Sequence, residues 1–283
     1  MQKLKILWYK VRAKLISSVV NLFSTQSNFD IKNTVLLIGS ARSGTTFLME
    51  SLNSNNEYRI IFEPFNPTYT KEWSTFSARH FIFPNEVNED EKQKVDNILR
   101  GRIKNSWVDQ YNRKIRSNKR LIKSVRANLM LDYFENEYPE LQIIYMHRNP
   151  YDVVASRINL NFDPKDVHLI LEHKFFITNH YSDIDITALK LLLKTPESCH
   201  AALWCFENRY ILRSLEKRRI IEAKYEVLIG KTVTLENAEL LISNKMRRPS
   251  VTSSIQKSYQ LSETEIGNVN EILTLFGMEE YIR

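Results

Sequence analysis

Several residue types are scarce in this 283-residue chain, and each scarcity excludes a class of protein. Six glycines and eight prolines are too few for a collagen-like or low-complexity chain. Two cysteines, Cys199 and Cys205, make neither a disulfide framework nor a zinc site, so we expect both in the core. No run approaches the roughly 18 apolar residues of a membrane-spanning helix. No Asn-x-Ser/Thr sequon with a middle residue other than proline occurs, which disfavours a glycosylated secretory protein.

The composition that is present favours one large folded domain. Apolar residues make up 43% of the chain and aromatic residues 11%, which is enough for a substantial core. No cluster of His, Asp or Cys has metal-ligand spacing, so we expect no metal.

Positive charge is unevenly distributed. The net charge is +7, and the five bases that precede the first acid, Asp30, account for most of it. A nucleic-acid-binding protein more often carries its excess charge on the folded domain, so we expect no nucleic-acid partner. A second basic stretch, Arg100–Arg126, contains ten Lys/Arg and only one acid, Asp109. It is either a solvated helical face or a wall that attracts an anionic ligand.

The N-terminal segment, residues 1–28, predicts a basic amphipathic helix. Its apolar residues recur at spacings of three and four: Leu4, Leu7, Trp8, Val11, Leu15, Val19 and Leu22. Such a helix either lies in an anionic membrane surface or packs on its own domain. We therefore expect a cytoplasmic protein, peripheral at the membrane in the first case.

The remainder, residues 29–283, predicts strands that alternate with helices. The expected strands are Thr34–Gly39, Tyr58–Phe62, Arg120–Lys123, Gln142–Met146 and Arg219–Lys224. The expected helices are Thr45–Asn53, Asn88–Arg102, Asn128–Glu137, Tyr151–Leu160, 166–180, 186–194, 197–215, about 234–245, and 262–276. This alternation indicates an α/β fold with a parallel sheet covered by helices on both faces. Ligands of such sheets bind at the carboxyl ends of the strands.

A candidate phosphate loop follows the first expected strand. The residues Gly39-Ser-Ala-Arg42-Ser43-Gly44-Thr45-Thr46 join a strand to a helix, which directs backbone N–H groups and hydroxyls at an anion. The spacing of Gly39, Gly44 and Thr46 is close to that of a Walker A loop, but Thr45 stands where the lysine belongs, and the cation is Arg42.

A second candidate anion site follows the fourth expected strand. Arg148 leaves the strand end, and Ser156 lies two turns into the next helix. A guanidinium can bind a phosphate with two parallel hydrogen bonds, and the hydroxyl can add another.

Together, the Arg-Ser-Gly-Thr-Thr loop and the Arg148/Ser156 pair resemble the two phosphate signatures of sulfotransferases that use 3′-phosphoadenosine-5′-phosphosulfate (PAPS). The resemblance covers roughly Thr34 to Leu228. It implies a P-loop-like three-layer sandwich with extra helices, PAPS as co-substrate and a glycan or lipid-linked acceptor hydroxyl. It implies cofactor binding by Arg42, Ser43, Gly44, Thr45, Thr46, Arg148, Ser156, Tyr225 and Arg248.

The resemblance also suggests residues for the reacting centre. Glu63 follows the second expected strand in Phe-Glu-Pro, as the catalytic glutamate of carbohydrate-type sulfotransferases does, and would act as general base. Lys123 ends the third expected strand and, with Arg42, would stabilise the leaving phosphate. His147, Trp204, Asn208 and Arg209 are expected to be structural.

Two alternatives remain open at this point. One is a P-loop kinase, against which the displaced lysine counts. The other is a catalytically inactive nucleotide-binding membrane adaptor, against which Glu63, Arg148 and Ser156 count.

Overall fold

The structure is a computed structural model that describes residues 23, 25–83, 87–213, 215–230 and 259–283. The expected N-terminal helix lies mostly outside the described residues, and its expected end is wrong, since Thr25–Gln26 form a strand and residues 27–28 are not helical. The expected helix at about 234–245 and Arg248 lie outside the described residues.

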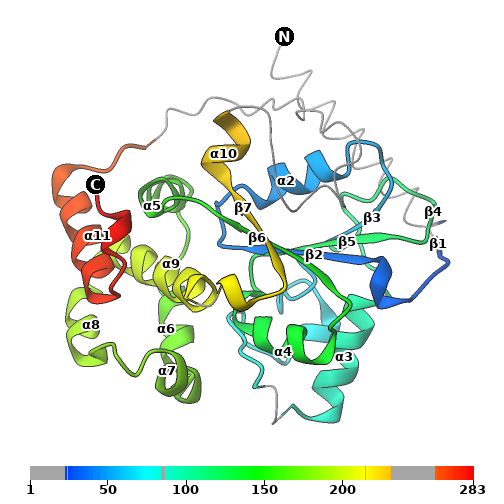
Figure 1. The fold of residues 1–283 in the computed structure, drawn as a ribbon, viewed down its shortest axis with the longest axis horizontal. Helices are drawn as coiled ribbons and strands as arrows, with labels where there is room; N and C mark the ends of the chain where they lie inside the picture. The colour runs from blue at the N-terminus through cyan, green and yellow to red at the C-terminus, as the bar shows by residue number, and fades with distance from the viewer. Residues whose placement is uncertain (1–22, 24, 84–86, 214, 231–258) are drawn as a thin grey trace.

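Five parallel strands form the central sheet in the order β3-β5-β2-β6-β7 (Figure 1). They are β2 (Thr34–Gly39), β3 (Arg59–Phe62), β5 (Arg120–Ser124), β6 (Gln142–His147) and β7 (Ile220–Lys224). Each lies within one residue of the strand expected from the sequence. Since all five run in the same direction, their carboxyl ends share one edge of the sheet.

Alternation of side chains along the strands produces two apolar faces. In the central strand β2, Leu36 and Ile38 belong to the larger core, whereas Val35 and Leu37 belong to the smaller one. The smaller core packs against α2 (Thr45–Leu52) and α10 (Tyr225–Gly230). The larger core packs against the remaining helices, so the expected three-layer α/β arrangement is confirmed (Figure 1).

The helices of the larger face gather around α9. They are α3 (Glu89–Leu99), α4 (Leu131–Glu137), α5 (Pro150–Asn159), α6 (Asp166–Leu171), α7 (Lys174–His180), α8 (Ile186–Leu192), α9 (Pro196–Leu212) and α11 (Glu263–Leu275). Helix α9 is buried along almost its whole length and contacts α5, α6 and α11. Cys199 and Cys205 lie on it as free, buried thiols, as expected.

Three local features differ from the sequence prediction. The expected helix 166–180 is two helices, α6 and α7, because the backbone of His173, at φ −79° and ψ 72°, leaves the helical region between them. Helix α10 was not expected and begins directly after β7. A short parallel pair, β1 (Thr25–Gln26) with β4 (Arg116–Ser117), was also not expected. Short 3₁₀ turns lie at Ile31–Asn33, Lys71–Trp73, Asn128–Met130, Leu215–Lys217 and Glu279–Tyr281.

The buried strands predict a large cost for core truncation. Leu36 is fully buried in β2, so Leu36→Ala should lower the free energy of unfolding by about 2–5 kcal/mol through lost burial and a residual cavity. Leu191→Ala is the matched control, since this side chain on α8 is 63% exposed, and it should change stability by less than about 0.5 kcal/mol. Denaturant unfolding measures both values, and equal effects would contradict the placement of β2.

Candidate active site

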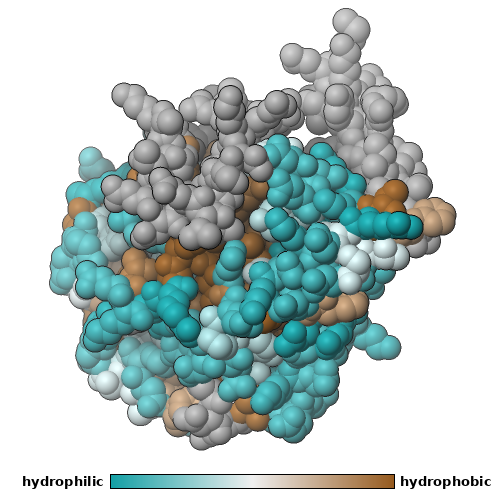
Figure 2. Space-filling model, turned by 45° about the vertical axis from the view of Figure 1, so that its right-hand side comes forward, coloured by the Kyte–Doolittle hydropathy of each residue, from teal (hydrophilic) through white to brown (hydrophobic). Residues whose placement is uncertain are grey.

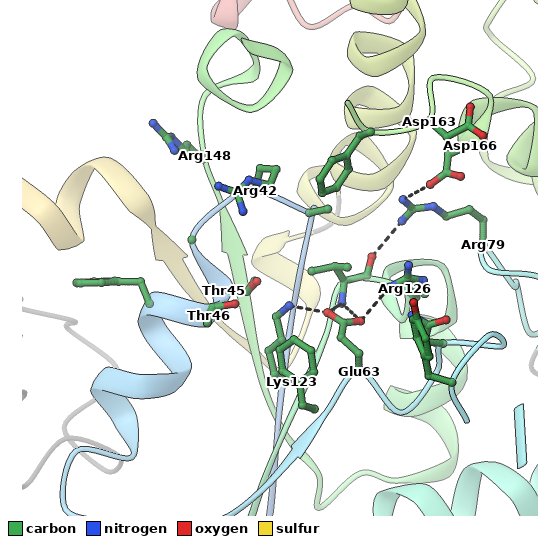
Figure 3. A pocket seen from close by; sticks show the side chains of 18 of the residues that line it. Arg42, Thr45, Thr46, Glu63, Arg79, Lys123, Arg126, Arg148, Asp163 and Asp166 are labelled. Carbon is green, nitrogen blue, oxygen red and sulfur yellow. Dashed lines mark hydrogen bonds and ion pairs between the residues drawn. The ribbon is translucent and has the colours of Figure 1, made fainter. Parts of the chain in front are cut away.

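A cavity of about 670 Å³ lies at the carboxyl edge of the sheet (Figure 3). Elements far apart in sequence line it because the loops after all five strands meet there. Its lining residues are Ala41, Arg42, Gly44, Thr45, Thr46, Phe47, Phe62, Glu63, Asn66, Tyr69, Arg79, Trp107, Lys123, Val125, Arg126, Arg148, Phe162, Asp163, Asp166 and Tyr225. Most of the site residues expected from the sequence therefore share one cavity.

The loop between β2 and α2 presents the start of a helix to this cavity. Gly44 is the N-cap of α2, with a left-handed backbone (φ 96°), and no side chain caps the helix. The first N–H groups of a helix have no intrahelical partner, so those of α2 are suited to an anion. Gly44 also allows a close approach, since a Cβ there would lie 2.4 Å from Cδ2 of Tyr225.

The side chains of this loop have different roles. Arg42, Thr45 and Thr46 line the cavity. Ser43 is fully buried, and its hydroxyl donates to the carbonyl oxygen of Ser40 at 2.7 Å, so this side chain shapes the loop and does not face the cavity. Arg42 has a left-handed backbone (φ 77°), which for a non-glycine residue costs on the order of 1 kcal/mol.

The second candidate anion site adjoins the first. Arg148 donates to Asp152 at 3.0 Å, and its guanidinium lies 4.2 Å from the centre of the Tyr225 ring. The Nε of Arg42 donates to the hydroxyl of Ser156 at 2.9 Å, so a residue of the first site contacts a residue of the second. Desolvation and the nearby charge of Arg148 lower the pKa of Arg42, and an anion bound between the two guanidiniums would offset their repulsion.

Glu63 lies in the cavity wall and is held by several donors. Its carboxylate accepts from Nζ of Lys123 at 2.5 Å, from the N–H of Val125 at 3.2 Å and from Nη1 of Arg126 at 3.3 Å. Both Glu63 and Lys123 are buried, and Glu63 has a left-handed backbone (φ 46°). The structure therefore brings the two residues together, whereas their roles in catalysis stay a prediction.

One wall of the cavity near Glu63 is aromatic. The rings of Tyr69 and Trp107 stack at 4.0 Å, and Phe62 meets Trp107 edge to face. The indole N–H of Trp107 donates to the carbonyl oxygen of Glu63 at 3.3 Å. Sequence reasoning missed this wall, because it is built from the segment 67–119, which matched no motif.

A buried network around Glu207 of α9 connects the two halves of the site. Its carboxylate accepts from the hydroxyl of Ser40 at 2.6 Å, from Arg157 at 3.0 Å and from Arg79 at 2.5 Å. Arg79 also donates to the carbonyl oxygen of Val125 at 3.1 Å, next to the support of Glu63. Glu207 is 1% exposed, and no local sequence pattern identifies it.

The four residues expected to be structural are all buried. The indole of Trp204 donates to the carbonyl oxygen of Arg148, and Asn208 donates to Ser40 and accepts from Tyr145. Arg209 pairs with Asp183 at 2.6 Å. His147 contacts Glu222 at 2.8 Å, and burial lowers its pKa.

The described part of the chain contains no group of three or more His, Cys, Asp or Glu arranged to hold a metal ion. Within the same residues, no helix is both long and apolar enough to cross a bilayer.

The parallel sheet, the loop at the start of α2 and the clustered cations define an α/β protein with a cation-lined cavity at its strand ends. The sulfotransferase family model matches residues 34–234, and the chain belongs to this family. It is therefore a transferase of sulfuryl groups. No curated protein and no solved structure matches the chain.

The tight contact at Gly44 leads to a prediction about ligand binding. Gly44→Ala places a methyl group against Tyr225 and strains the backbone, so it should weaken binding of adenosine 3′,5′-bisphosphate by more than about tenfold. Gly267→Ala is the control, because a Cβ there meets nothing within 4 Å, and in α11 it should leave binding unchanged. Calorimetry of both variants tests this, and normal affinity of the Gly44 variant would refute the loop as a binding element.

Proposed function

We propose that this sulfotransferase takes the sulfuryl group from PAPS and transfers it to an acceptor hydroxyl. The observation that carries the proposal is the hydrogen bond between Arg42 and Ser156. It joins a side chain of the loop before α2 to a side chain of α5, which supports a single site that includes both segments. A ligand with anionic groups on both sides of a nucleoside can therefore contact both.

The residues present fit a bisphosphorylated nucleotide. Nε of Arg148 is buried without a hydrogen-bond partner, as expected for a donor that a phosphate oxygen satisfies. Its guanidinium also lies over Tyr225, which limits its orientations. We assign the start of α2 to the 5′-phosphosulfate and Arg148 with Ser156 to the 3′-phosphate. Tyr225 completes this side of the site, and Arg248 is proposed from sequence alone.

PAPS supplies a sulfuryl group on a phosphate leaving group. The chain must then orient the acceptor, remove its proton and stabilise charge on the leaving oxygen. We assign the removal of the acceptor's proton to the Glu63 carboxylate. Three donors hold this carboxylate in a fixed position in the cavity wall. Lys123 carries two N–H donors besides the one given to Glu63, and with Arg42 it would stabilise the leaving phosphate.

The part of the cavity next to Glu63 supports an acceptor hydroxyl that belongs to a glycan or a lipid-linked substrate. The stacked rings of Tyr69 and Trp107 offer a flat apolar face next to Glu63. Asn66, Arg126 and Asp163 line the same cavity and can bind neighbouring hydroxyl groups. The kinase and adaptor alternatives have less support, because the family match extends across all five strands.

Transfer of labelled sulfate from PAPS to a panel of glycans, lipids and peptides tests the activity. We expect transfer to at least one hydroxyl-bearing acceptor of the panel. Hydrolysis or transfer that requires ATP with magnesium, together with no use of PAPS, would contradict the proposal.

Removal of the Arg148 guanidinium should weaken nucleotide binding. Arg148→Ala loses a charge-assisted contact with the 3′-phosphate and should reduce affinity for adenosine 3′,5′-bisphosphate by about 2–4 kcal/mol. Arg116→Ala is the control, since Arg116 is exposed on β4, outside the cavity. Titration calorimetry gives both affinities, and an Arg148 variant that binds like the control would remove this residue from the site.

Glu63 should affect turnover and not nucleotide affinity. Glu63→Gln keeps the shape of the side chain but removes the base, so turnover should fall by about 10²–10⁴ while bisphosphate affinity is retained. Glu271→Gln, an exposed change on α11, should match the wild type. Steady-state rates decide the point, and near-normal turnover of the Glu63 variant would rule it out as the base.

A further inference from the structure

A second surface of interest lies at the opposite edge of the sheet, where the strands begin. We call it the basic face and define it by exposed cations and exposed apolar side chains. Its cations are Arg102, Lys104, Arg113, Arg116 and Lys119, and its apolar members are Phe23, Phe29 and Ile115. Phe23 is 68% exposed and Ile115 is 53% exposed, although both are large apolar residues.

Contacts show that the basic face is continuous. The N–H of Thr25 donates to the carbonyl oxygen of Ile115 at 2.7 Å, and β1 pairs with β4, so Thr25 lies beside Arg116. The guanidinium of Arg102 lies 5.7 Å from the centre of the Phe29 ring. A hollow of about 210 Å³ joins Phe29, Arg102 and Lys104 to Thr25. Figure 1 shows β1 and β4 together at the end of the sheet away from α5.

Acids only partly neutralise this surface. Asp96 pairs with Arg102 at 2.7 Å, and Glu57 lies 3.9 Å from Lys119. Asp109, the single acid of the stretch from Arg100 to Arg126, is buried and pairs with Arg59 at 2.9 Å, and its charge also acts on Lys104. The cations of the basic stretch therefore do not line the cavity as a whole, because only two of the ten, Lys123 and Arg126, are among its lining residues.

The chain enters the described fold at this face. Residues 1–22 carry five bases and no acid, with apolar residues at helical spacing, and they connect to Phe23 and β1. The basic N-terminal segment is therefore connected directly to the basic face through Phe23. The described part of the face in Figure 2 is mainly hydrophilic, with exposed hydrophobic side chains in a hollow and at one edge.

We propose that the basic face docks on an anionic lipid bilayer. Cations alone would suit any polyanion, but Phe23, Phe29 and Ile115 project among them, and a bilayer interface takes up apolar side chains next to basic ones. The catalytic cavity lies at the other edge of the sheet. Of the two acceptor classes proposed above, docking in this orientation favours a glycan reached from water over a substrate linked to a lipid of the same bilayer.

The test uses the full-length chain and phosphatidylcholine vesicles with and without phosphatidylserine. Each basic residue near such a surface contributes about fivefold to partitioning. The combined variant R102Q/K104Q/R113Q/R116Q should therefore bind phosphatidylserine vesicles more than tenfold more weakly, with a smaller dependence on salt. The substitution I115S should weaken binding as well.

A matched variant controls for net charge. K174Q/K190Q/K194Q/K217Q removes four exposed lysines from α7, α8, the connection between α8 and α9, and the turn after α9, and it should bind vesicles like the wild type. Circular dichroism confirms that each variant is folded. Three results would overturn the proposal: wild-type binding by the basic-face variant, equal loss in the matched variant, or binding that heparin or RNA shows and phosphatidylserine vesicles do not. This test does not depend on the proposed sulfuryl donor.

Discussion

The Glu207 carboxylate accepts hydrogen bonds from Ser40, Arg79 and Arg157 in the interior of the protein. Ser40 belongs to the loop that leads to the start of α2, and Arg79 supports the backbone next to Glu63. One carboxylate therefore fixes the geometry between the half of the cavity at the start of α2 and the half that contains Glu63. Its removal would leave two buried guanidiniums without their shared partner, which is costly in a low-dielectric interior. Strained backbone at Arg42 and Glu63 persists on either side of this network.

The sequence was sufficient to predict the strands and the edge at which the site forms. Where short apolar runs such as TVLLIG and QIIYM alternate with helical segments along a chain, they usually form buried parallel strands. The residues that follow them, Arg42, Glu63, Lys123 and Arg148, must then meet at the carboxyl edge. Each of these residues follows an apolar run, and all of these runs are parallel strands of one sheet. Their meeting in one cavity could therefore be predicted.

Other parts of the site could not be predicted, because they depend on contacts between distant segments. Glu207 is an ordinary helical glutamate in sequence, and only the packing of α9 beneath the β2 loop gives it three donors. Trp107 reaches Glu63 from a segment without a motif. Ser43 was expected among the cofactor-binding residues, and the spacing of the loop residues does not reveal the turn in which its hydroxyl donates to Ser40. The basic stretch from Arg100 to Arg126 could be a solvated face or a wall that attracts an anion. The sequence could not decide between them, because β5 carries the end of this stretch to the carboxyl edge of the sheet and leaves its start at the opposite edge.

The central claim is that the start of α2 and the Arg148/Ser156 site hold opposite ends of one nucleotide. Titration calorimetry with adenosine 3′,5′-bisphosphate, adenosine 5′-phosphate and adenosine 3′-phosphate tests it directly. If one ligand spans both sites, the bisphosphate binds with a stoichiometry of one, and each monophosphate binds more than about tenfold more weakly, since each loses a charge-assisted contact. A bisphosphate that binds no more tightly than the better monophosphate, or that binds twice, would contradict the claim.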